Sequence, residues 1–328
     1  MKTTALQSFG IDNLHVIDRP EPKPGVGQVL LKMKAWSLNY RDLLVAKGLY
    51  NPKLKFPFVP LSDGVGDGVT RVKLGERVAG IFMQRWLAGD LNDAAGKSAL
   101  GGAIEGVAAE QVVLHEDGIV KVPTHLSDEE AATLPCAAVT AWNALVVRGG
   151  VKPGDTVLVQ GTGGVSIFAL QSARLMGARV IATSSSNEKL ERVKKMGASD
   201  GINYKETPAW EEKVRVLTGG VGVDHVVEVG GAGTFNQSLK AVRIGGSVSL
   251  IGVLAGKGEP NLMPLLMKSV CVHGIYVGSR EMFEAMNRAI ALHQLRPVVD
   301  RVFGLNEIQA ALKHMESAGH FGKVCLRA

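Results

Sequence analysis

The segment GTGGVS, which follows the apolar run TVLVQ, has the residue types and spacing of a phosphate-binding turn. It opens a stretch with helical spacing, and a turn between a strand and a helix is the context that dinucleotide binding requires. Gly161 allows the tight turn, and Gly163 lets the backbone approach a pyrophosphate. The amides that open the helix, at Gly164 and Val165, supply hydrogen-bond donors. Ser166 stands where a third glycine is usual, so an ordinary glycine turn remains the alternative interpretation.

The polar segment at 183–187, about 20 residues further on, concerns the choice of cofactor. Dinucleotide sites for NAD place an Asp or Glu there, but this segment reads TSSSN and has no carboxylate. The hydroxyls of Ser184 and Ser185, followed by Lys189, could hold a 2′-phosphate, which favours NADP(H). Alternatively, Ser185 and Glu188 form a capping box for the following helix.

The remaining reactive residue types form no recognisable metal or nucleophile motif. Cys136, Cys271 and Cys325 lie far apart in the sequence, which excludes a four-cysteine zinc motif and a disulfide framework. The eight histidines form no i, i+4 pair, and GxSxG does not occur. Few dispersed cysteines are typical of a reducing cytoplasm.

The elements that must position the glycine turn alternate regularly after Pro153. Apolar runs rich in β-branched residues alternate with stretches of helical spacing, which predicts βαβ units and a parallel sheet. The expected strands lie at 156–160, 179–183, 200–204, 224–229 and 246–252, and the expected helices at 164–176, 187–196, 208–217 and 234–241.

The first 125 residues have a different pattern. Val29, Leu31, Met33 and Ala35 share one face with Lys32 and Lys34 opposite, and Pro and Gly turns surround such short runs, so we expect a mostly β domain. The last 50 residues or so predict two helices, at 279–293 and 305–317, and a final strand at 323–327.

The composition limits the class of protein. A chain of 328 residues predicts about two domains, and 46% hydrophobic with 21% charged residues is typical of a folded globular protein. The net charge of +6 is spread along the chain without a block of five like charges, so we expect no nucleic-acid partner. No run of 18 apolar residues and no signal-peptide core occur, so we expect no membrane association and a cytoplasmic location.

Taken together, these motifs resemble the medium-chain dehydrogenase/reductase superfamily over essentially the whole chain. The segments that carry the resemblance are Asn39-Tyr40-Arg41-Asp42, Gly64-Val65-Gly66-Asp67-Gly68, LPCAAVTAW, GTGGVS and Gly322-Lys323-Val324. The resemblance implies an α/β fold with two domains. A GroES-like, mostly β catalytic domain would comprise 1–125 and 280–328, and a Rossmann domain with a doubly wound parallel sheet would comprise 126–279.

The resemblance also bears on zinc. Zinc members of the superfamily have a cysteine at the position of Asn39 and a His-Glu pair at the positions of Ser62 and Asp63, so that Cys136 alone matches a ligand. One thiolate cannot hold a tetrahedral zinc ion, so we expect no catalytic metal. The chain resembles instead the zinc-free quinone oxidoreductase and enone reductase branch, in which Asn39 and Tyr50 would line the substrate cleft.

Further cofactor contacts follow from the same resemblance. Thr140 is expected at the central phosphates or the nicotinamide ribose, Lys189 and Tyr204 at the 2′-phosphate, Val229, Gly230 and Val253 beside the nicotinamide, and Lys323 as a contact from the C-terminal strand.

The resemblance implies zinc-independent transfer of hydride from NADPH to a quinone or an α,β-unsaturated carbonyl. Without zinc, the oxyanion needs hydrogen-bond donors, for which Asn39 and Tyr50 are the candidates. Asn39 could instead cap a turn, and Tyr50 could be an exposed aromatic in a turn. Two other functions stay open: an NAD(P)-dependent alcohol dehydrogenase or carbonyl reductase, and a non-catalytic protein that binds NADPH as a sensor or structural element.

Two other segments lead to an expectation or an open question. The run VCVHGIYV at 270–277 is apolar on both faces, and we expect this edge strand to join two subunits in a homodimer. The segment 84–106 fits the superfamily pattern poorly, and its Trp86 could be part of the core or an anchor for a loop.

Overall fold

The computed structural model describes residues 1–68, 75–252, 254, 256 and 258–328. Its contacts divide the chain into two compact units, Met1–Val139 with Gly278–Ala328, and Thr140–Val277. The predicted division after residue 125 differs from this one, because helix α3 (Asp128–Ala132) packs on strands of the first unit. The chain therefore leaves the first unit later than the sequence pattern indicates.

The first unit is built on a mostly antiparallel sheet with the order β14-β15-β3-β4-β5-β7, and β6 pairs with β3. A separate hairpin, β1–β2, precedes it. The strands are β1 (Lys2–Leu6), β2 (Leu14–Asp18), β3 (Gln28–Ser37), β4 (Asp63–Gly68), β5 (Glu76–Gly80), β6 (Gln111–His115), β7 (Ile119–Lys121), β14 (Val299–Gly304) and β15 (Lys323–Arg327).

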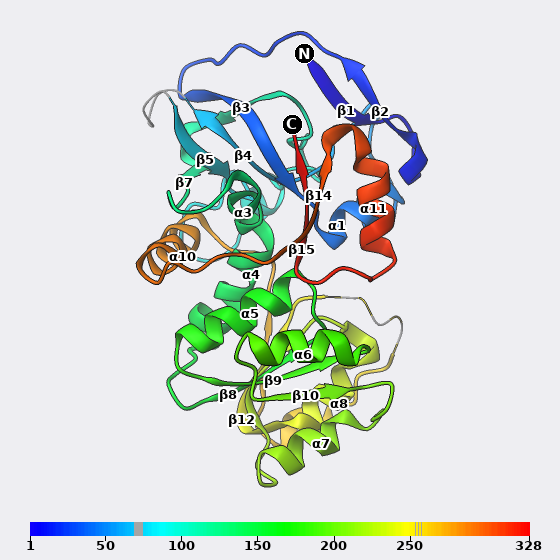
Figure 1. Cartoon of the computed structure of the whole chain (residues 1–328), viewed down its shortest axis with the longest axis vertical. Helices are drawn as coiled ribbons and strands as arrows, with labels where there is room; N and C mark the ends of the chain where they lie inside the picture. The colour runs from blue at the N-terminus through cyan, green and yellow to red at the C-terminus, as the bar shows by residue number, and fades with distance from the viewer. Residues whose placement is uncertain (69–74, 253, 255, 257) are drawn as a thin grey trace. The chain divides into compact units, whose positions relative to one another are not determined.

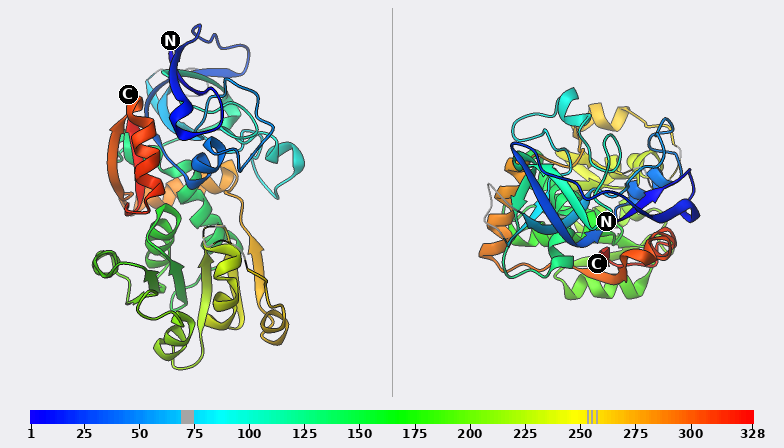
Figure 2. Two further views of the ribbon diagram at one scale, coloured as in Figure 1. Left: turned by 90° about the vertical axis from the view of Figure 1, so that its right-hand side faces the viewer. Right: turned by 90° about the horizontal axis from the view of Figure 1, so that it is seen from above.

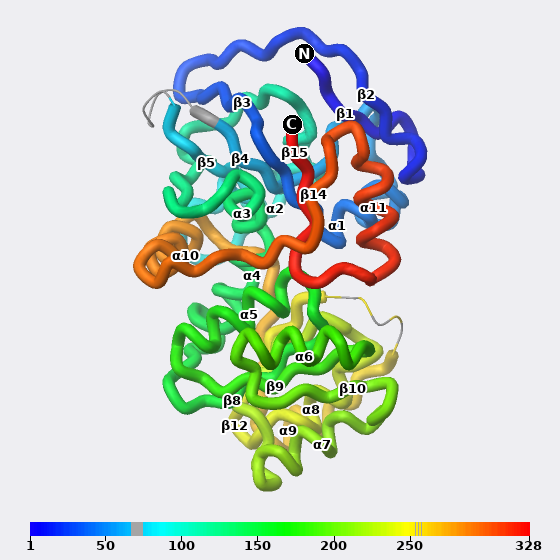
Figure 3. Tube along the Cα trace, viewed as in Figure 1, coloured from blue at the N-terminus to red at the C-terminus, as the bar shows by residue number. Residues whose placement is uncertain are grey.

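Strand β3 shows why this sheet forms. Val29, Leu31 and Met33 are buried while Lys32 is exposed, so the predicted alternation is confirmed. Strand β15 pairs antiparallel with the other end of β3, with Cys325 opposite Ser37. The first and last parts of the chain therefore lie side by side in one unit (Figures 2 and 3).

Short helices connect the strands of the first unit and pack around its sheet. They are η1 (Ile11–Asn13), α1 (Tyr40–Ala46), α2 (Asp93–Gly96), η2 (Glu116–Gly118), α3, η3 (Leu134–Ala138), α10 (Arg280–Leu292), η6 (Leu305–Glu307) and α11 (Ile308–Glu316). The helices predicted at 279–293 and 305–317 correspond to α10 and to η6 with α11. Helix α1, which follows Asn39, and strand β14 were not predicted.

The second unit is a parallel sheet with the order β10-β9-β8-β11-β12-β13. Figure 1 labels β8, β9, β10 and β12 of this sheet. Its strands are β8 (Thr156–Gln160), β9 (Arg179–Ser184), β10 (Asp200–Asn203), β11 (Val223–Glu228), β12 (Val242–Leu250) and β13 (Cys271–Gly274). The order reverses between β8 and β11, which makes this a doubly wound Rossmann sheet. The fold is thus α/β with a GroES-like β unit, as expected.

Helices of the second unit follow the predicted alternation closely. They are α4 (Val139–Trp142), which spans the boundary between the units, η4 (Asn143–Arg148), α5 (Gly164–Leu175), α6 (Asn187–Lys195), α7 (Trp210–Leu217), η5 (Gly231–Gly233), α8 (Phe235–Ala241) and α9 (Met263–Met267). Helix α5 packs on β8 and β9, and α8 packs on β11 and β12. Among the described residues, no helix is both long and apolar enough to cross a bilayer.

Candidate functional site

The predicted glycine turn joins β8 to α5. Gly161 has φ of +69°, a conformation that glycine adopts readily, and a Cβ atom at Gly161 or Gly163 would meet nothing within 4 Å. Helix α5 begins at Gly164, followed by Val165, so their amides belong to its first turn. The open space beside backbone donors fits a dinucleotide pyrophosphate. Ser166 is buried and donates to the Gln160 carbonyl over 2.5 Å, so its hydroxyl closes this turn.

Ser184, Ser185 and Tyr204 lie together at the carboxyl end of β9. The Tyr204 amide donates to the Ser184 carbonyl over 3.0 Å, which places Tyr204 directly beside the end of β9. Lys189 is in the first turn of α6. The predicted capping box is wrong, because the N-cap residue is Ser186, whose hydroxyl accepts from the Lys189 amide over 3.3 Å. Ser185 is therefore not used as the cap of α6.

Other predicted cofactor residues also belong to the second unit. Thr140 is buried in α4, and Val229 and Gly230 follow directly after β11. Val253 lies outside the described residues. Prediction from sequence missed Glu228 and Gln160, the polar ends of β11 and β8, although a carboxylate that ends an apolar strand was a visible signal.

Asn39 and Lys323 come together in the first unit. Lys323, at the start of β15, donates through Nζ to Asn39 Oδ1 over 2.6 Å and also to the Leu38 carbonyl. Because an ammonium group can only donate, the amide oxygen of Asn39 must face it and the Nδ2 group must face elsewhere. Nδ2 is buried and has no hydrogen-bond partner among the described residues. The expected contact of Lys323 with a cofactor stays a prediction.

Asn39 also stands at the N-cap position of α1. The Asn39 amide donates to the Asp42 carboxylate over 2.8 Å, so Asp42 orders the start of the helix. Burial raises the pKa of Asp42, although Arg41 and the Asn39 amide act in the opposite direction. Asn39 therefore caps α1 through its backbone amide, as the alternative interpretation predicted in part. Its side-chain oxygen contacts Lys323 instead.

Asp63 contacts Ser62 and Cys136, two of the residues at positions that hold zinc in other members of the superfamily. Its carboxylate accepts from the Ser62 hydroxyl over 2.7 Å and from the Cys136 amide over 3.2 Å. Burial raises the Asp63 pKa, and Lys323, Asn39 and Ser62 act against that rise. Burial, reinforced by the Asp63 carboxylate, also raises the pKa of the Cys136 thiol to about 12. At neutral pH this cysteine is therefore a thiol.

Arg41 connects this cluster to Tyr50. Its guanidinium carbon is 4.4 Å from the centroid of the Phe82 ring and 5.5 Å from that of the Tyr50 ring. The Nη2 atom is 3.5 Å from Asp42, while buried Nε and Nη1 have no hydrogen-bond partner among the described residues. Burial acts to lower the pKa of Arg41, but Asp42, Tyr50, Cys136 and Asp63 together outweigh it and the pKa is raised. Arg41 is thus a buried cation with unused donors.

These residues do not fit a tetrahedral zinc ion. Tetrahedral zinc sites are built from Cys, His, Asp or Glu ligands, whereas Asn39 and Ser62 are neutral residues and the Asn39 oxygen is held by Lys323. In the described part of the chain, no group of three or more His, Cys, Asp or Glu side chains is placed to hold a metal. The N–H groups of this cluster and its two buried cations suit an oxygen acceptor instead.

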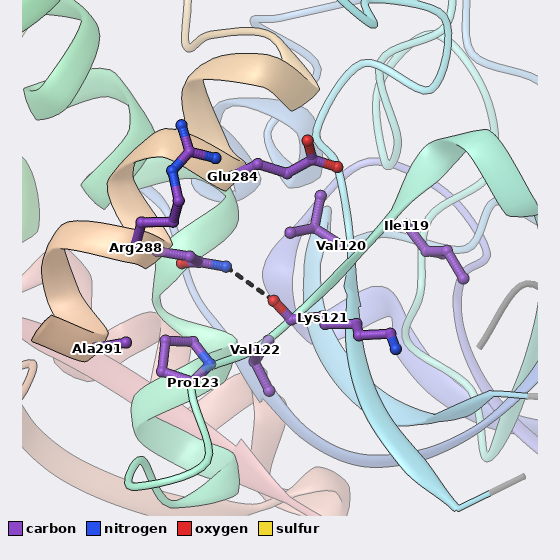
Figure 4. A pocket seen from close by; sticks show the side chains of 9 residues that line it. Ile119, Val120, Lys121, Val122, Pro123, Glu284, Arg288 and Ala291 are labelled. Carbon is purple, nitrogen blue, oxygen red and sulfur yellow. Dashed lines mark hydrogen bonds between the residues drawn. The ribbon is translucent and has the colours of Figure 1, made fainter. Parts of the chain in front are cut away.

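A separate pocket of about 440 Å³ lies between β7 and α10 (Figure 4). Its wall includes Val120, Pro123, Glu284 and Arg288, and Asn287 donates to the Lys121 carbonyl over 2.9 Å. None of the predicted site residues lines it. Trp86 is buried and donates to the Gly89 carbonyl over 2.9 Å, so it is both a core residue and an anchor for its loop.

Comparisons with known proteins agree with this architecture. Residues 25–124 match the alcohol dehydrogenase GroES-like domain, and residues 164–291 match the zinc-binding dehydrogenase family. A zinc-type alcohol dehydrogenase-like protein of Schizosaccharomyces pombe is 46% identical over 97% of this chain and 96% of its own length. An acryloyl-coenzyme A reductase of Metallosphaera sedula is 31% identical over 93% of this chain and 94% of its own length.

Solved structures extend the likeness over the whole chain. A putative alcohol dehydrogenase from Sinorhizobium meliloti has a TM-score of 0.93 at 43% identity, covering 100% of this chain and 98% of the other. The mycobacterial protein Rv1454c, solved with NADPH, has a TM-score of 0.83 at 29% identity, with both chains fully covered. A quinone oxidoreductase from Coxiella burnetii has a TM-score of 0.79 at 26% identity, covering 100% of this chain and 99% of the other.

A GroES-like β unit, a Rossmann unit with a glycine turn and these relatives together define the family. The chain belongs to the medium-chain dehydrogenase/reductase superfamily. It is an alcohol dehydrogenase-like oxidoreductase.

Proposed function

We propose that this protein reduces a conjugated carbonyl or a quinone with NADPH and without zinc. The observation that carries the proposal is the pair of buried guanidinium donors Arg41 Nε and Nη1, which have no hydrogen-bond partner among the described residues, together with Asn39 Nδ2, which makes no hydrogen bond of ordinary geometry and lies near the Asp63 carboxylate. Leaving a buried donor unpaired costs about 1–3 kcal/mol, so such a cluster supports an oxygen acceptor as its ligand.

When bound, reduced nicotinamide supplies the hydride that these residues themselves lack. The residues of this chain bind the carbonyl oxygen of the substrate and stabilise the negative charge that develops on it. Lys323 holds the amide oxygen of Asn39, so that Nδ2 is the atom left to donate, and the Tyr50 hydroxyl is the second candidate donor. A conjugated acceptor spreads its charge over several atoms and demands less stabilisation than a simple ketone, which favours enones and quinones.

The residues of the second unit support a nicotinamide cofactor, and we propose NADP(H) over NAD(H). The turn at Gly161 and Gly163 has open space for a pyrophosphate. Ser184 and Tyr204 lie side by side at the end of β9, and the segment 183–187 contains no Asp or Glu. A 2′-phosphate needs donors and the absence of a fixed negative charge at this point. The relative solved with NADPH is consistent with this preference.

One experiment tests the function directly. Initial rates are measured with NADPH and NADH against quinones, enones, aldehydes and alcohols, and Asn39→Ala and Tyr50→Phe are compared with Tyr40→Phe, an exposed residue of the same region. We expect the largest kcat/KM with NADPH and an enone or quinone, and a loss of about 10²-fold in Asn39→Ala. Turnover confined to alcohols and aldehydes would establish the alcohol dehydrogenase alternative. NADPH binding without turnover of any acceptor would establish a sensor.

We also propose that the protein forms a homodimer through β13. This strand ends the sheet order among the described residues, and most of its side chains are exposed. Apolar side chains that precede it, Met263, Leu266 and Met267 of α9, are more than half exposed. An exposed strand edge beside apolar side chains favours pairing with a second copy.

Light scattering at micromolar concentration tests the dimer. One chain has a mass of 34.7 kDa. We expect twice this mass for the natural protein and the mass of a single chain for Val272→Lys. Val302→Lys places the same change on β14, an edge strand of the other sheet, and should leave the dimer intact. A natural protein that runs as a monomer contradicts the proposal.

A further inference from the structure

The carboxylate of Glu228 lies at the point where the order of the Rossmann sheet reverses. Glu228 ends β11 and Gln160 ends β8, and these two strands are neighbours at the reversal. Gln160 Nε2 donates to Glu228 Oε2 over 2.8 Å, so the pair spans the reversal. In doubly wound sheets, ligands bind beside the carboxyl ends of the strands at this point.

The carboxylate organises the loop that follows β11. Its Oε1 atom accepts from the Gly230 amide over 2.8 Å, from the Gly231 amide over 2.9 Å and from the Thr234 hydroxyl over 2.6 Å. Its Oε2 atom accepts from Ser238 as well as from Gln160. These five donors are neutral, and Glu228 itself is fully buried. Its acceptor atoms thus fix the loop from several sides at once.

The backbone of the same loop leaves little freedom. Gly231 has φ of +79°, which favours glycine, and a Cβ atom at Gly230 would lie 2.1 Å from the Thr234 hydroxyl. Gln160 Oε1 lies 3.3 Å from the Val229 amide and 3.4 Å from the Gly230 amide, both of which donate to it. In this arrangement Gln160 and Glu228 between them satisfy the amides of Val229, Gly230 and Gly231.

Gln160 links this loop to the glycine turn. Its main-chain carbonyl accepts from Ser166 in the first turns of α5, while its side chain holds Val229 and Gly230. The turn proposed for the pyrophosphate and the loop proposed for the nicotinamide are thus joined through one residue. The two contacts use different parts of Gln160, so a shift of the loop changes the bonds of its side chain while its main-chain carbonyl can keep the bond from Ser166.

We propose that Glu228 is a positioning residue for the nicotinamide half of the cofactor, acting through Val229 and Gly230. This inference rests on the proposed use of a nicotinamide dinucleotide. Glu228→Gln keeps the size of the side chain but replaces one acceptor oxygen with an NH₂ group, which faces donors whichever way the amide turns. The loop should then shift or loosen, while the glycine turn and the residues at the end of β9 keep their contacts.

Calorimetric titration with two ligands tests this role. NADPH is compared with 2′-phospho-ADP-ribose, which has the same phosphates and adenosine but no nicotinamide. We expect Glu228→Gln to weaken NADPH about tenfold and to leave the affinity for the fragment unchanged. Glu211→Gln is the matched control, because Glu211 is a buried carboxylate of α7 in the same unit, and it should alter neither affinity. Thr234→Val, which removes one donor only, should show the same selective effect if Glu228→Gln does not fold.

The outcomes separate this inference from the proposed function. Equal weakening of both ligands, or no weakening of either, would overturn the positioning role while NADPH binding by the natural protein stands. Failure of the natural protein to bind either ligand would overturn both proposals. A selective loss of NADPH affinity supports the role of Glu228.

Discussion

Lys323 donates to the side-chain oxygen of Asn39 over 2.6 Å, although 284 residues separate them in the chain. The contact exists because β15 pairs with β3, and α1 begins shortly after β3. It determines which end of the Asn39 amide is available, since the ammonium group can face only the oxygen. In the proposed reaction, Lys323 therefore acts through Asn39.

Removal of this cation should impair turnover. In Lys323→Met the amide of Asn39 is free to turn, and we expect kcat with an enone to fall about 10-fold to 100-fold. Lys313→Met, which breaks an exposed pair with Asp12, should have no such effect. Steady-state kinetics with varied NADPH is the measurement. A raised KM for NADPH with unchanged kcat would instead support Lys323 as a direct cofactor contact.

The choice between NADPH and NADH should respond to a negative charge at the end of β9. Ser185→Asp places a carboxylate where a 2′-phosphate is expected, and we predict that the ratio of kcat/KM for NADPH to that for NADH falls at least about tenfold. Ser199→Asp, at an exposed position of the same unit, controls for added charge. If the ratio is the same in both variants, the 2′-phosphate site lies elsewhere.

Two cysteines should resist alkylation in the folded protein. Burial raises the pKa of Cys136 and of Cys325 to about 12, so at pH 8 only about one thiol in ten thousand is ionised. We expect iodoacetamide to label both slowly in the native protein and quickly in guanidinium chloride, as followed by mass spectrometry of peptides. Fast labelling of native Cys136 at pH 7 would show a thiolate and revive the question of a metal.

Asp224 should make the stability depend on pH. Burial acts to raise its pKa, but Arg243 Nε at 2.6 Å and the Thr156 amide at 2.7 Å outweigh it and the pKa is lowered. A carboxylate with a lowered pKa stabilises the fold above its unfolded pKa, near 3.8, and this contribution disappears as the pH falls through the lower folded value.

Urea unfolding of Asp224→Asn tests this dependence. We expect a loss of about 1 kcal/mol at pH 7, reduced by partial exposure, and a smaller difference from the natural protein at pH 3. Asp18→Asn, in an exposed pair with Lys2, should change the urea midpoint less at both pH values. An equal loss for Asp224→Asn at pH 7 and pH 3 would contradict the role of the ionised carboxylate.

Local patterns in the sequence predicted much of this protein. The alternation of apolar runs and helical spacing predicted strands β8 to β12 and helices α5 to α8 within a few residues, because each strand and helix carries its own periodicity. The glycine turn at Gly161 and Gly163 was found for the same reason, since a tight turn between a strand and a helix has a local signature. Strand β13 is shorter than predicted and ends at Gly274.

Only the tertiary structure decided which distant residues meet. Pairing of β15 with β3 brings Lys323 to Asn39, and pairing of β11 with β8 brings Glu228 to Gln160. Strand β14 forms because it pairs with β15, although its own residues show only a weak alternation of buried and exposed positions. A hydrogen bond between residues far apart in sequence depends on strand order and register, and no short segment encodes either one.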